Sequence, residues 1–268
     1  MLNILIGIGV FYVILLLVLF VFQKQFVFHP ESELHLTPSY AGLEFESVTF
    51  ETMDEEDIHG WFIPHENARA TLLYFHGNAG NMSDRVESVK MLHDLKLNIF
   101  IIDYRGYGQS TGSPSESGTY RDARAAWKYL TETRNISAEE VVLYGRSLGG
   151  AVAIELATRV QPGAMIIGST FTSARDMARK MFPYVPVGIL MGISYNSERR
   201  IAHVQIPTLI THSVDDDLIP FELGKRLFDA ANEPKRFVEL HGGHNDNVFV
   251  SRDEYLSAID SLIADYID

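Results

Sequence analysis

A single short stretch near the middle of the chain constrains the fold more than any other. Residues 141–144 (VVLY) form an apolar run that predicts a buried strand, residues 145–149 (GRSLG) follow at once, and residues 151–158 have helical character. A serine between two glycines at a strand-to-helix turn matches the pattern G-x-S-x-G, which holds the hydroxyl beside the positive end of the helix. Glycines are needed because side chains in so sharp a turn would collide with their neighbours. We therefore expect Ser147 to be a nucleophile.

The first residues form the most apolar part of the chain. Between Leu2 and Phe22 there is no charged side chain and one strongly polar one, Asn3. As a helix this run would be roughly 31 Å long, enough to cross a bilayer. The alternative is a cleaved signal peptide, but a basic leader and a small-x-small site after the run are both missing. We expect residues 1–24 to be an uncleaved, single-pass transmembrane anchor.

Charge and cysteine content limit the partners of the chain. Lys24 lies on the C-terminal side of the apolar run, and the only positive charge on the other side is the α-amino group. The positive-inside rule therefore favours a cytoplasmic catalytic domain. The net charge is −13 and no cluster of Lys and Arg occurs, so no nucleic-acid partner is expected. The chain has no cysteine, which excludes disulfides, thiolate metal sites and cysteine nucleophiles.

The rest of the chain alternates between strand and helix patterns. Residues 25–42, with Pro30 and Pro38, read as an irregular linker. The expected strands are 43–52, 58–63, 71–75, 98–102, 141–144, 164–167, 208–211 and 236–240, and the expected helices are 86–95, 120–130, 151–158, 223–231 and 255–266. The first two strands are expected to pair antiparallel, and the later ones, which are continuously apolar, predict a mostly parallel sheet with helices on both faces. We expect one α/β domain over residues 43–268.

One segment interrupts this alternation. Residues 181–191 (MFPYVPVGILM) are apolar and contain two prolines, which argue against a regular helix. The whole connection, about residues 174–205, is longer than an ordinary link between a strand and a helix. It is either a helix with a packed loop or a small lid that lines an apolar substrate pocket.

A nucleophilic serine needs a base beside it and an acid that orients the base. In enzymes that use this strand–serine–helix turn, the acid and then the histidine follow the serine along the chain. Residues 213–220 (SVDDDLIP) follow one predicted strand, and residues 239–246 (ELHGGHND) follow the last. Both loops therefore lie at the carboxyl edge of the sheet, where open α/β sheets place their sites.

Two histidines compete for the role of base. His244 follows two glycines in a loop from which its ring can reach Ser147, whereas His241 is closer to the strand, so we favour His244. A metal site built from both histidines and the aspartates matches no zinc spacing, and no metal is expected. The run Asp215, Asp216 and Asp217 is either a solvated turn or the source of the orienting acid, and its place after a strand favours the acid.

An oxyanion that forms during catalysis needs backbone N–H groups. The residue after the nucleophile, Leu148, supplies one, and the glycine-rich loop at residues 76–81 (HGNAGN) is expected to supply another. A phosphate cradle is the alternative for this loop, but the P-loop pattern and its lysine are absent. No cofactor is expected.

Four blocks carry a family resemblance: residues 75–81 (FHGNAGN), 103–110 (DYRGYGQS), 145–150 (GRSLGG) and 243–246 (GHND). They resemble the signature blocks of membrane-anchored α/β-hydrolase-domain proteins, the Bem-type, serine-aminopeptidase-like branch of serine hydrolases. The resemblance covers roughly residues 28–267 and implies the α/β-hydrolase fold. It places the acid on Asp216, four residues before Pro220, and the second oxyanion amide on Asn78. The palmitoylated N-terminal cysteine cluster of some relatives is absent.

Relatives in this branch include depalmitoylases and lipid esterases, so the resemblance implies an acyl ester or thioester substrate. We expect a membrane-anchored serine hydrolase that uses Ser147, His244 and Asp216 and acts on a lipophilic acyl group. Two alternatives remain: a peptidase acting on small peptides, and a non-catalytic scaffold or receptor with the same fold.

Overall fold

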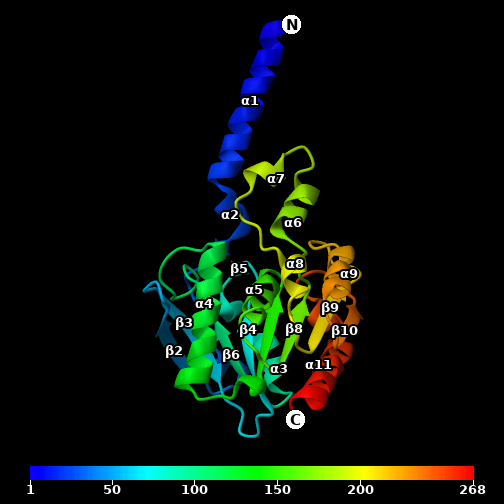
Figure 1. The fold of residues 1–268 in the computed structure, drawn as a ribbon. Helices are drawn as coiled ribbons and strands as arrows, with labels where there is room; N and C mark the ends of the chain where they lie inside the picture. The colour runs from blue at the N-terminus through cyan, green and yellow to red at the C-terminus, as the bar shows by residue number, and fades with distance from the viewer.

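The computed structural model describes residues 1–268, except the side chain of Ile189. An eight-stranded sheet forms the centre of its domain (Figure 1). The strand order across the sheet is β10-β9-β8-β7-β4-β6-β3-β2. The strands are β2 (Glu46–Glu51), β3 (Asp57–Ile63), β4 (Ala70–Phe75), β6 (Leu97–Ile102), β7 (Val141–Arg146), β8 (Ala164–Gly168), β9 (Thr208–Ser213) and β10 (Lys235–Leu240).

The sheet is parallel from β10 to β6, and two antiparallel pairs close its other end. β3 runs antiparallel to β6, and β2 runs antiparallel to β3. The six inner strands carry mostly apolar side chains that are buried on both faces, which is why their sequences lack the alternation seen in β2. The expected mostly parallel α/β sheet is confirmed.

Helices cover both faces of the sheet and give each face its own hydrophobic core. The helices α4 (Glu116–Lys128), α5 (Leu148–Ala157), α8 (Ser197–Ile201) and α9 (Phe221–Ala230) pack in succession on one face. The helices α3 (Val86–His93) and α11 (Arg252–Tyr266) lie on the other. The shorter helical segments are η1 (Pro38–Ala41), η2 (Met82–Arg85), η3 (Tyr129–Thr133), η4 (Ala138–Glu140) and α10 (Asn247–Val250).

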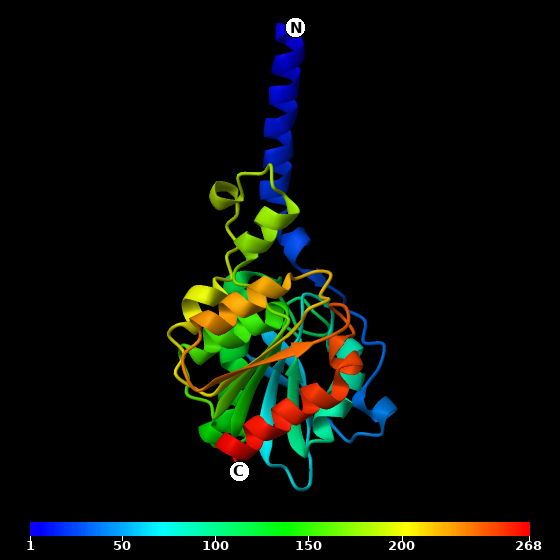
Figure 2. The ribbon, with the colours of Figure 1, turned by 90° about the vertical axis from the view of Figure 1, so that its right-hand side faces the viewer.

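The N-terminal helix α1 (Leu2–Val21) projects from the domain, and none of its residues is buried (Figures 1 and 2). Its mean hydropathy reaches 3.2, so it is long and apolar enough to cross a membrane. The short helix α2 (Gln23–Val27) continues the helical chain three residues past Lys24. The strand β1 (His29–Pro30) then pairs with β5 (Ala79–Gly80), which joins the expected linker to the domain.

The segment that interrupts the alternation forms α6 (Ala174–Met181) and the single turn α7 (Val187–Leu190). Both stand at the end of the domain from which α1 projects, beside α1 and α2 in both views (Figures 1 and 2). Pro183 and Pro186 separate the two helices, because proline removes a backbone donor and clashes with the preceding turn. The side chain of Ile189, within the apolar run, lies outside the described part of the chain.

Candidate active site

Ser147 occupies a strained turn between β7 and α5. Its backbone has φ 55° and ψ −121°, a conformation that non-glycine residues rarely adopt. Hydrogen bonds hold both sides of the turn: the Ser147 amide donates to the Gly168 carbonyl at 2.9 Å, and Thr170 Oγ1 donates to the Ser147 carbonyl at 3.1 Å. Strain that is held in this way at a single polar residue is characteristic of functional sites.

The glycines around Ser147 are required by close backbone packing. A Cβ at Gly145 would overlap the Gly149 carbonyl, and a Cβ at Gly149 would overlap the carbonyl of Phe75 at the end of β4. The helix α5 begins at Leu148, three residues before the expected start at residue 151. Glycine has a low helix propensity, but close packing of Gly149 against the sheet outweighs it here.

The structure brings Ser147, His244 and Asp216 together from three loops. His244 Nε2 lies 3.1 Å from Ser147 Oγ, and His244 Nδ1 lies 2.9 Å from Asp216 Oδ2. All three side chains are buried or nearly so. The imidazole therefore bridges a hydroxyl and a carboxylate, an arrangement in which histidine can take the hydroxyl proton while the carboxylate stabilises the resulting cation.

The carboxylate of Asp216 is kept ionised by its surroundings. Burial alone would raise its pKa, but the hydrogen bond from His244, the charge of His244 and the backbone amides of Ile219 and Leu218 lower the pKa below its usual value. These amides donate to Oδ1 at 2.7 and 3.0 Å. An ionised Asp216 accepts the His244 Nδ1–H, which leaves Nε2 as the acceptor that faces Ser147.

The neighbouring aspartates have different partners. Asp215 Oδ2 lies 3.0 Å from His241 Nδ1, and both side chains are more than half exposed. Asp217 Oδ1 accepts the backbone amide of His244 at 2.8 Å. The structure therefore separates the competing residues: His241 and Asp215 form a surface pair, and His244 and Asp216 form the pair beside Ser147.

The loop that carries His244 is held by two further side chains. Arg146, the residue before Ser147, donates to the His244 carbonyl. Asn247 Nδ2 donates to the Gly243 carbonyl at 2.9 Å and to the His244 carbonyl at 3.2 Å. Sequence reasoning missed Arg146, Asn247 and the backbone contact of Asp217, because no local pattern tells which loop a polar side chain will reach.

Two backbone N–H groups are available beside Ser147. Among the described residues, the amides of Asn78 and Leu148 donate no hydrogen bond to another protein group. The Asn78 carbonyl is fixed by the His29 amide at 3.0 Å and by the Tyr107 hydroxyl at 2.8 Å. Both Asn78 and Leu148 line a cavity together with Ser147. Free amides fixed in this way are the donors that an oxyanion requires.

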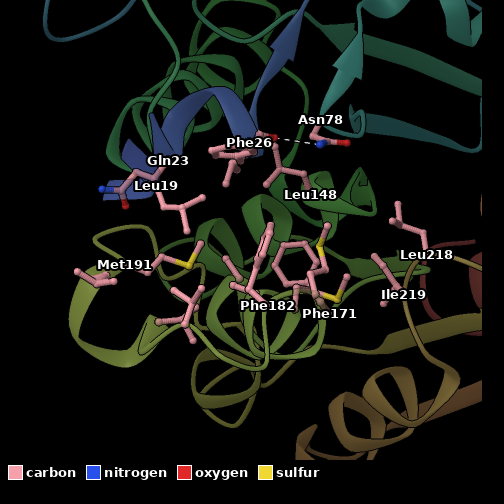
Figure 3. Close-up of a pocket in the computed structure, with 18 of the residues that line it drawn as sticks. Leu19, Gln23, Phe26, Asn78, Leu148, Phe171, Phe182, Met191, Leu218 and Ile219 are labelled. Atoms are coloured by element: carbon pink, nitrogen blue, oxygen red, sulfur yellow. Dashed lines mark hydrogen bonds between the residues drawn. The ribbon is translucent and has the colours of Figure 1, made fainter. Parts of the chain in front are cut away.

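An apolar cavity of about 430 Å³ reaches Ser147 from the side of α1. Figure 3 shows its walls: α1 and α2 on one side and α6 and α7 on the other. Most of its lining is aliphatic, aromatic or methionine: Leu19, Phe20, Phe26, Val27, Leu148, Phe171, Ala174, Met177, Ala178, Met181, Phe182, Val185, Val187, Leu190, Met191, Leu218 and Ile219. The polar lining residues are Gln23, His29, Asn78 and Ser147. A largely apolar cavity with a few polar groups in its lining is the usual form of a ligand site.

The contribution of the N-terminal helices to this cavity was not predicted from the sequence. Hydrogen bonds join these helices to the domain: Asn78 Nδ2 donates to the Val27 carbonyl at 2.9 Å, drawn as the dashed line in Figure 3, and the Gly192 amide donates to Gln23 Oε1 at 2.8 Å. Phe26 and Phe182 pack edge to face across the gap. The segment expected to be only an anchor therefore forms a wall of the cavity.

A second cavity of about 500 Å³ meets the first at Ser147, Asn78 and Leu218. Its lining is mixed and includes the charged residues Asp84, Arg85, Glu87 and Arg146 together with His244. Within the described residues, no group of three or more His, Asp or Glu side chains is arranged to hold a metal ion. Ser147 thus lies between an apolar cavity and one of mixed polarity, so two chemically different parts of one ligand could lie on opposite sides of it.

Comparisons with known proteins agree with this architecture. The family model described as serine aminopeptidase, S33, matches residues 66–190. The Mycobacterium tuberculosis protein Rv2307c is 36% identical over 240 residues, which cover 88% of this chain and 85% of that protein. The Schizosaccharomyces pombe protein bem46 is 35% identical over 242 residues, covering 85% and 80%. The Pyrococcus furiosus esterase Pf2001 superimposes with a TM-score of 0.76 at 18% identity, covering 90% of this chain and 98% of that one, a similarity of fold alone.

The sheet, its covering helices and the serine turn at its carboxyl edge are those of an α/β hydrolase. Sequence identity above 30% over most of both chains also shows which family of α/β hydrolases the chain belongs to. The chain belongs to the Bem-type, serine-aminopeptidase-like family of α/β hydrolases.

Proposed function

We propose that the protein is a membrane-anchored serine hydrolase that cleaves carboxylic esters or thioesters of lipophilic acyl groups. The observation that carries the proposal is the hydrogen-bonded chain from Ser147 Oγ through His244 to Asp216, at 3.1 and 2.9 Å. Within it, Ser147 is the nucleophile, His244 the general base and Asp216 the orienting acid. We further propose that residues 1–24 are the anchor and residues 43–268 the catalytic domain, with residues 174–205 as its lid.

Each step of the reaction then has a group in place. Ser147 Oγ attacks the carbonyl carbon while its proton passes to His244 Nε2, and the amides of Asn78 and Leu148 bind the oxyanion. His244 returns the proton to the leaving oxygen or sulfur as the carbonyl re-forms, which leaves an acyl-enzyme. Water, deprotonated by His244, then attacks the acyl-enzyme, and the released proton regenerates Ser147.

The lipophilic character of the substrate is inferred from the cavity beside Ser147. Its lining is almost entirely apolar, so burial of an acyl chain there would be favourable by about 0.8 kcal/mol for each methylene. The anchoring helix α1 supplies part of that lining, which favours a helix that is retained over a signal peptide that is removed. Lys24, the first charged side chain of the sequence, favours a cytoplasmic domain.

A fluorophosphonate probe, which reacts with activated serines, tests the chemistry. Wild-type protein should be labelled, Ser147→Ala should not, and the control Ser257→Ala, on the exposed side of α11, should be labelled like wild type. Absence of labelling in wild type would support the scaffold alternative, and persistent labelling of Ser147→Ala would refute Ser147 as the nucleophile. Faster cleavage of aminoacyl anilides than of acyl esters would instead support the peptidase.

A further inference from the structure

The α6–α7 connection ends in an exposed apolar tip, defined here as residues 181–193. This tip contains no charged side chain. Tyr184 is 88% exposed and Met181 59% exposed, although both lie beside other apolar residues of the tip. Large exposed apolar side chains in an uncharged segment of this kind usually mark a protein interface or a membrane contact.

The tip is tied to the middle of α1. The Tyr12 hydroxyl donates to the Tyr184 carbonyl at 2.7 Å. Tyr12 lies about 14 Å along the helix from Val21, close to half of the roughly 30 Å hydrocarbon thickness that α1 is long enough to cross. If α1 spans the bilayer, the tip therefore lies inside the leaflet nearest the domain. The Tyr12 bond also provides a donor for a carbonyl that hydrocarbon could not solvate.

Charged residues stop where the tip begins. Arg179 and Lys180, at the end of α6, are exposed and directly precede Met181. Lys24 is also exposed and follows α1 by three residues. Cations at the base of an apolar insertion can reach the phosphates of the headgroups while their aliphatic stems stay near the hydrocarbon.

The outer walls of the apolar cavity consist of these same elements. Leu19 and Phe20 of α1 face Met181 and Phe182 at the start of the tip, and the cavity continues from them to Ser147. The part of the cavity wall farthest from Ser147 is therefore built from α1 and the tip, two separate segments, rather than from the sheet. Movement of the tip relative to α1 would open the cavity to the leaflet without disturbing the residues around Ser147.

We propose that the tip is immersed in the leaflet nearest the domain, and that the acyl chain of a bilayer lipid passes sideways between α1 and the tip to reach Ser147. The partner of the exposed apolar surface is thus the lipid bilayer itself rather than another protein. The lateral entry of substrate rests on the proposed hydrolase activity, whereas the immersion of the tip rests only on the proposed membrane anchor.

The absence of cysteine allows a direct test of immersion. Tyr184→Cys in the full-length chain, labelled with the fluorophore NBD and reconstituted in phosphatidylcholine vesicles, should show blue-shifted emission that nitroxide-labelled lipids quench. The contact to Tyr12 uses the Tyr184 backbone, so it is retained. Tyr40→Cys is the matched control, because Tyr40 is 74% exposed on η1, which packs against α3 in the body of the domain. Its label should emit as in water.

Two results would overturn immersion. A label at residue 184 that emits as in water, like the label at residue 40, would place the tip outside the bilayer. A blue-shifted label that nitroxide lipids do not quench would mean that protein, such as a second copy of this chain, covers the tip.

Paired substrates test lateral entry. Tyr184→Asp should lower hydrolysis of a long-chain ester embedded in vesicles at least tenfold, and should leave fluorophosphonate labelling and hydrolysis of a soluble acetate ester unchanged. Tyr40→Asp should leave all three unchanged. Equal loss of both activities, or loss of neither, would overturn lateral entry. Failure of wild type to react with the probe would refute the proposed function instead, and the fluorescence result on immersion would stand.

Discussion

The two sides of Ser147 are built in different ways. On the polar side, His244 and Asp216 come from loops that follow adjacent strands of the sheet, and hydrogen bonds to backbone groups fix both loops. On the apolar side, most of the wall comes from α1, α2, α6 and α7, none of which belongs to the sheet or its two main helical layers. One region can therefore be rigid while the other adapts.

This difference matches the demands of the proposed reaction. Proton transfer and oxyanion binding need distances held within a few tenths of an ångström, and strand ends in a close-packed core provide such precision. Acyl-chain binding needs apolar area rather than exact geometry, and helices outside the two main layers, with methionine side chains, provide it. We expect changes on the polar side to abolish the reaction for every substrate, and changes on the apolar side to alter its selectivity.

The largest effect is expected from the histidines. His244→Ala should lower kcat/KM for every ester by about 10⁴-fold or more, since the base and its contact to Ser147 Oγ are lost. His241→Ala should change kcat/KM less than twofold, because His241 is exposed and pairs with Asp215 at the surface. Steady-state hydrolysis of a short ester measures both. Comparable losses in the two variants would contradict the assignment of the base.

The next largest effect, a loss of about 10⁴-fold in kcat, is expected from one of the three aspartates. Asp216→Asn is expected to lose that much in kcat, as a neutral amide can favour the wrong tautomer of His244. Asp217→Asn should lose less than tenfold, because the amide oxygen of asparagine can still accept the His244 backbone N–H. Asp215→Asn should stay within twofold. A loss for Asp216→Asn no greater than for its neighbours would refute the proposed acid.

The apolar side should respond selectively. Ala178→Trp fills part of the cavity, so kcat/KM for a decanoate ester should fall about 10- to 100-fold, the worth of two or three buried methylenes. Hydrolysis of an acetate ester should not change. Asp229→Trp places the same side chain at an exposed position of α9, away from the cavity, and should leave both activities unchanged. An equal loss for decanoate and acetate with Ala178→Trp would show that the two sides of Ser147 are not independent.

A smaller change is expected where the N-terminal helices meet the tip. Gln23→Ala removes the acceptor of the Gly192 amide, a bond worth about 0.5–1.5 kcal/mol. Long-chain hydrolysis should fall by a few-fold, with short-chain hydrolysis unaffected. Gln25→Ala, at an exposed position on the same helix, is the control. If both variants behave alike, the Gln23 contact does not shape the cavity.

The smallest effect concerns stability and pH. The pKa of Asp216 is lowered in the folded protein, so its carboxylate contributes stability above its unfolded pKa of about 3.9, and this stability is lost as pH falls through the folded pKa. As pH falls below about 4, the free energy of unfolding of wild type should therefore decrease relative to that of Asp216→Asn. Urea unfolding of the full chain in detergent measures it. The difference between wild type and Ala178→Trp should not vary with pH, since neither side chain titrates.

Much of the polar side could be predicted from the sequence because its signals are local. Ser147 has a strand before it, a helix after it and glycines where a Cβ cannot fit, and each of these is a property of neighbouring residues. The order of the three loops along the chain indicated which residues would meet. The local signals could not choose among three consecutive aspartates, and Asp216 was assigned only by resemblance.

The apolar side was largely beyond such reasoning. The apolar run at residues 181–191 predicted either a packed loop or a lid, and composition does not tell what such a segment faces. The run at residues 2–22 predicted a membrane span, and the same apolar side chains suit a bilayer and a cavity wall equally well. Leu19 and Phe26 line the cavity only because α2 and β1 return the chain to the domain.

The sequence by itself therefore determined the α/β architecture, the serine turn between β7 and α5, and the region of the chain that supplies each of its partners, since these depend on periodicity and on short-range steric limits. Tertiary structure alone decided that His241 and Asp215 pair at the surface, that Arg146 holds the His244 loop and that α1 and α2 join α6 and α7 around the cavity. These contacts link residues far apart in the chain, and their distances are set by how the sheet and its helices pack.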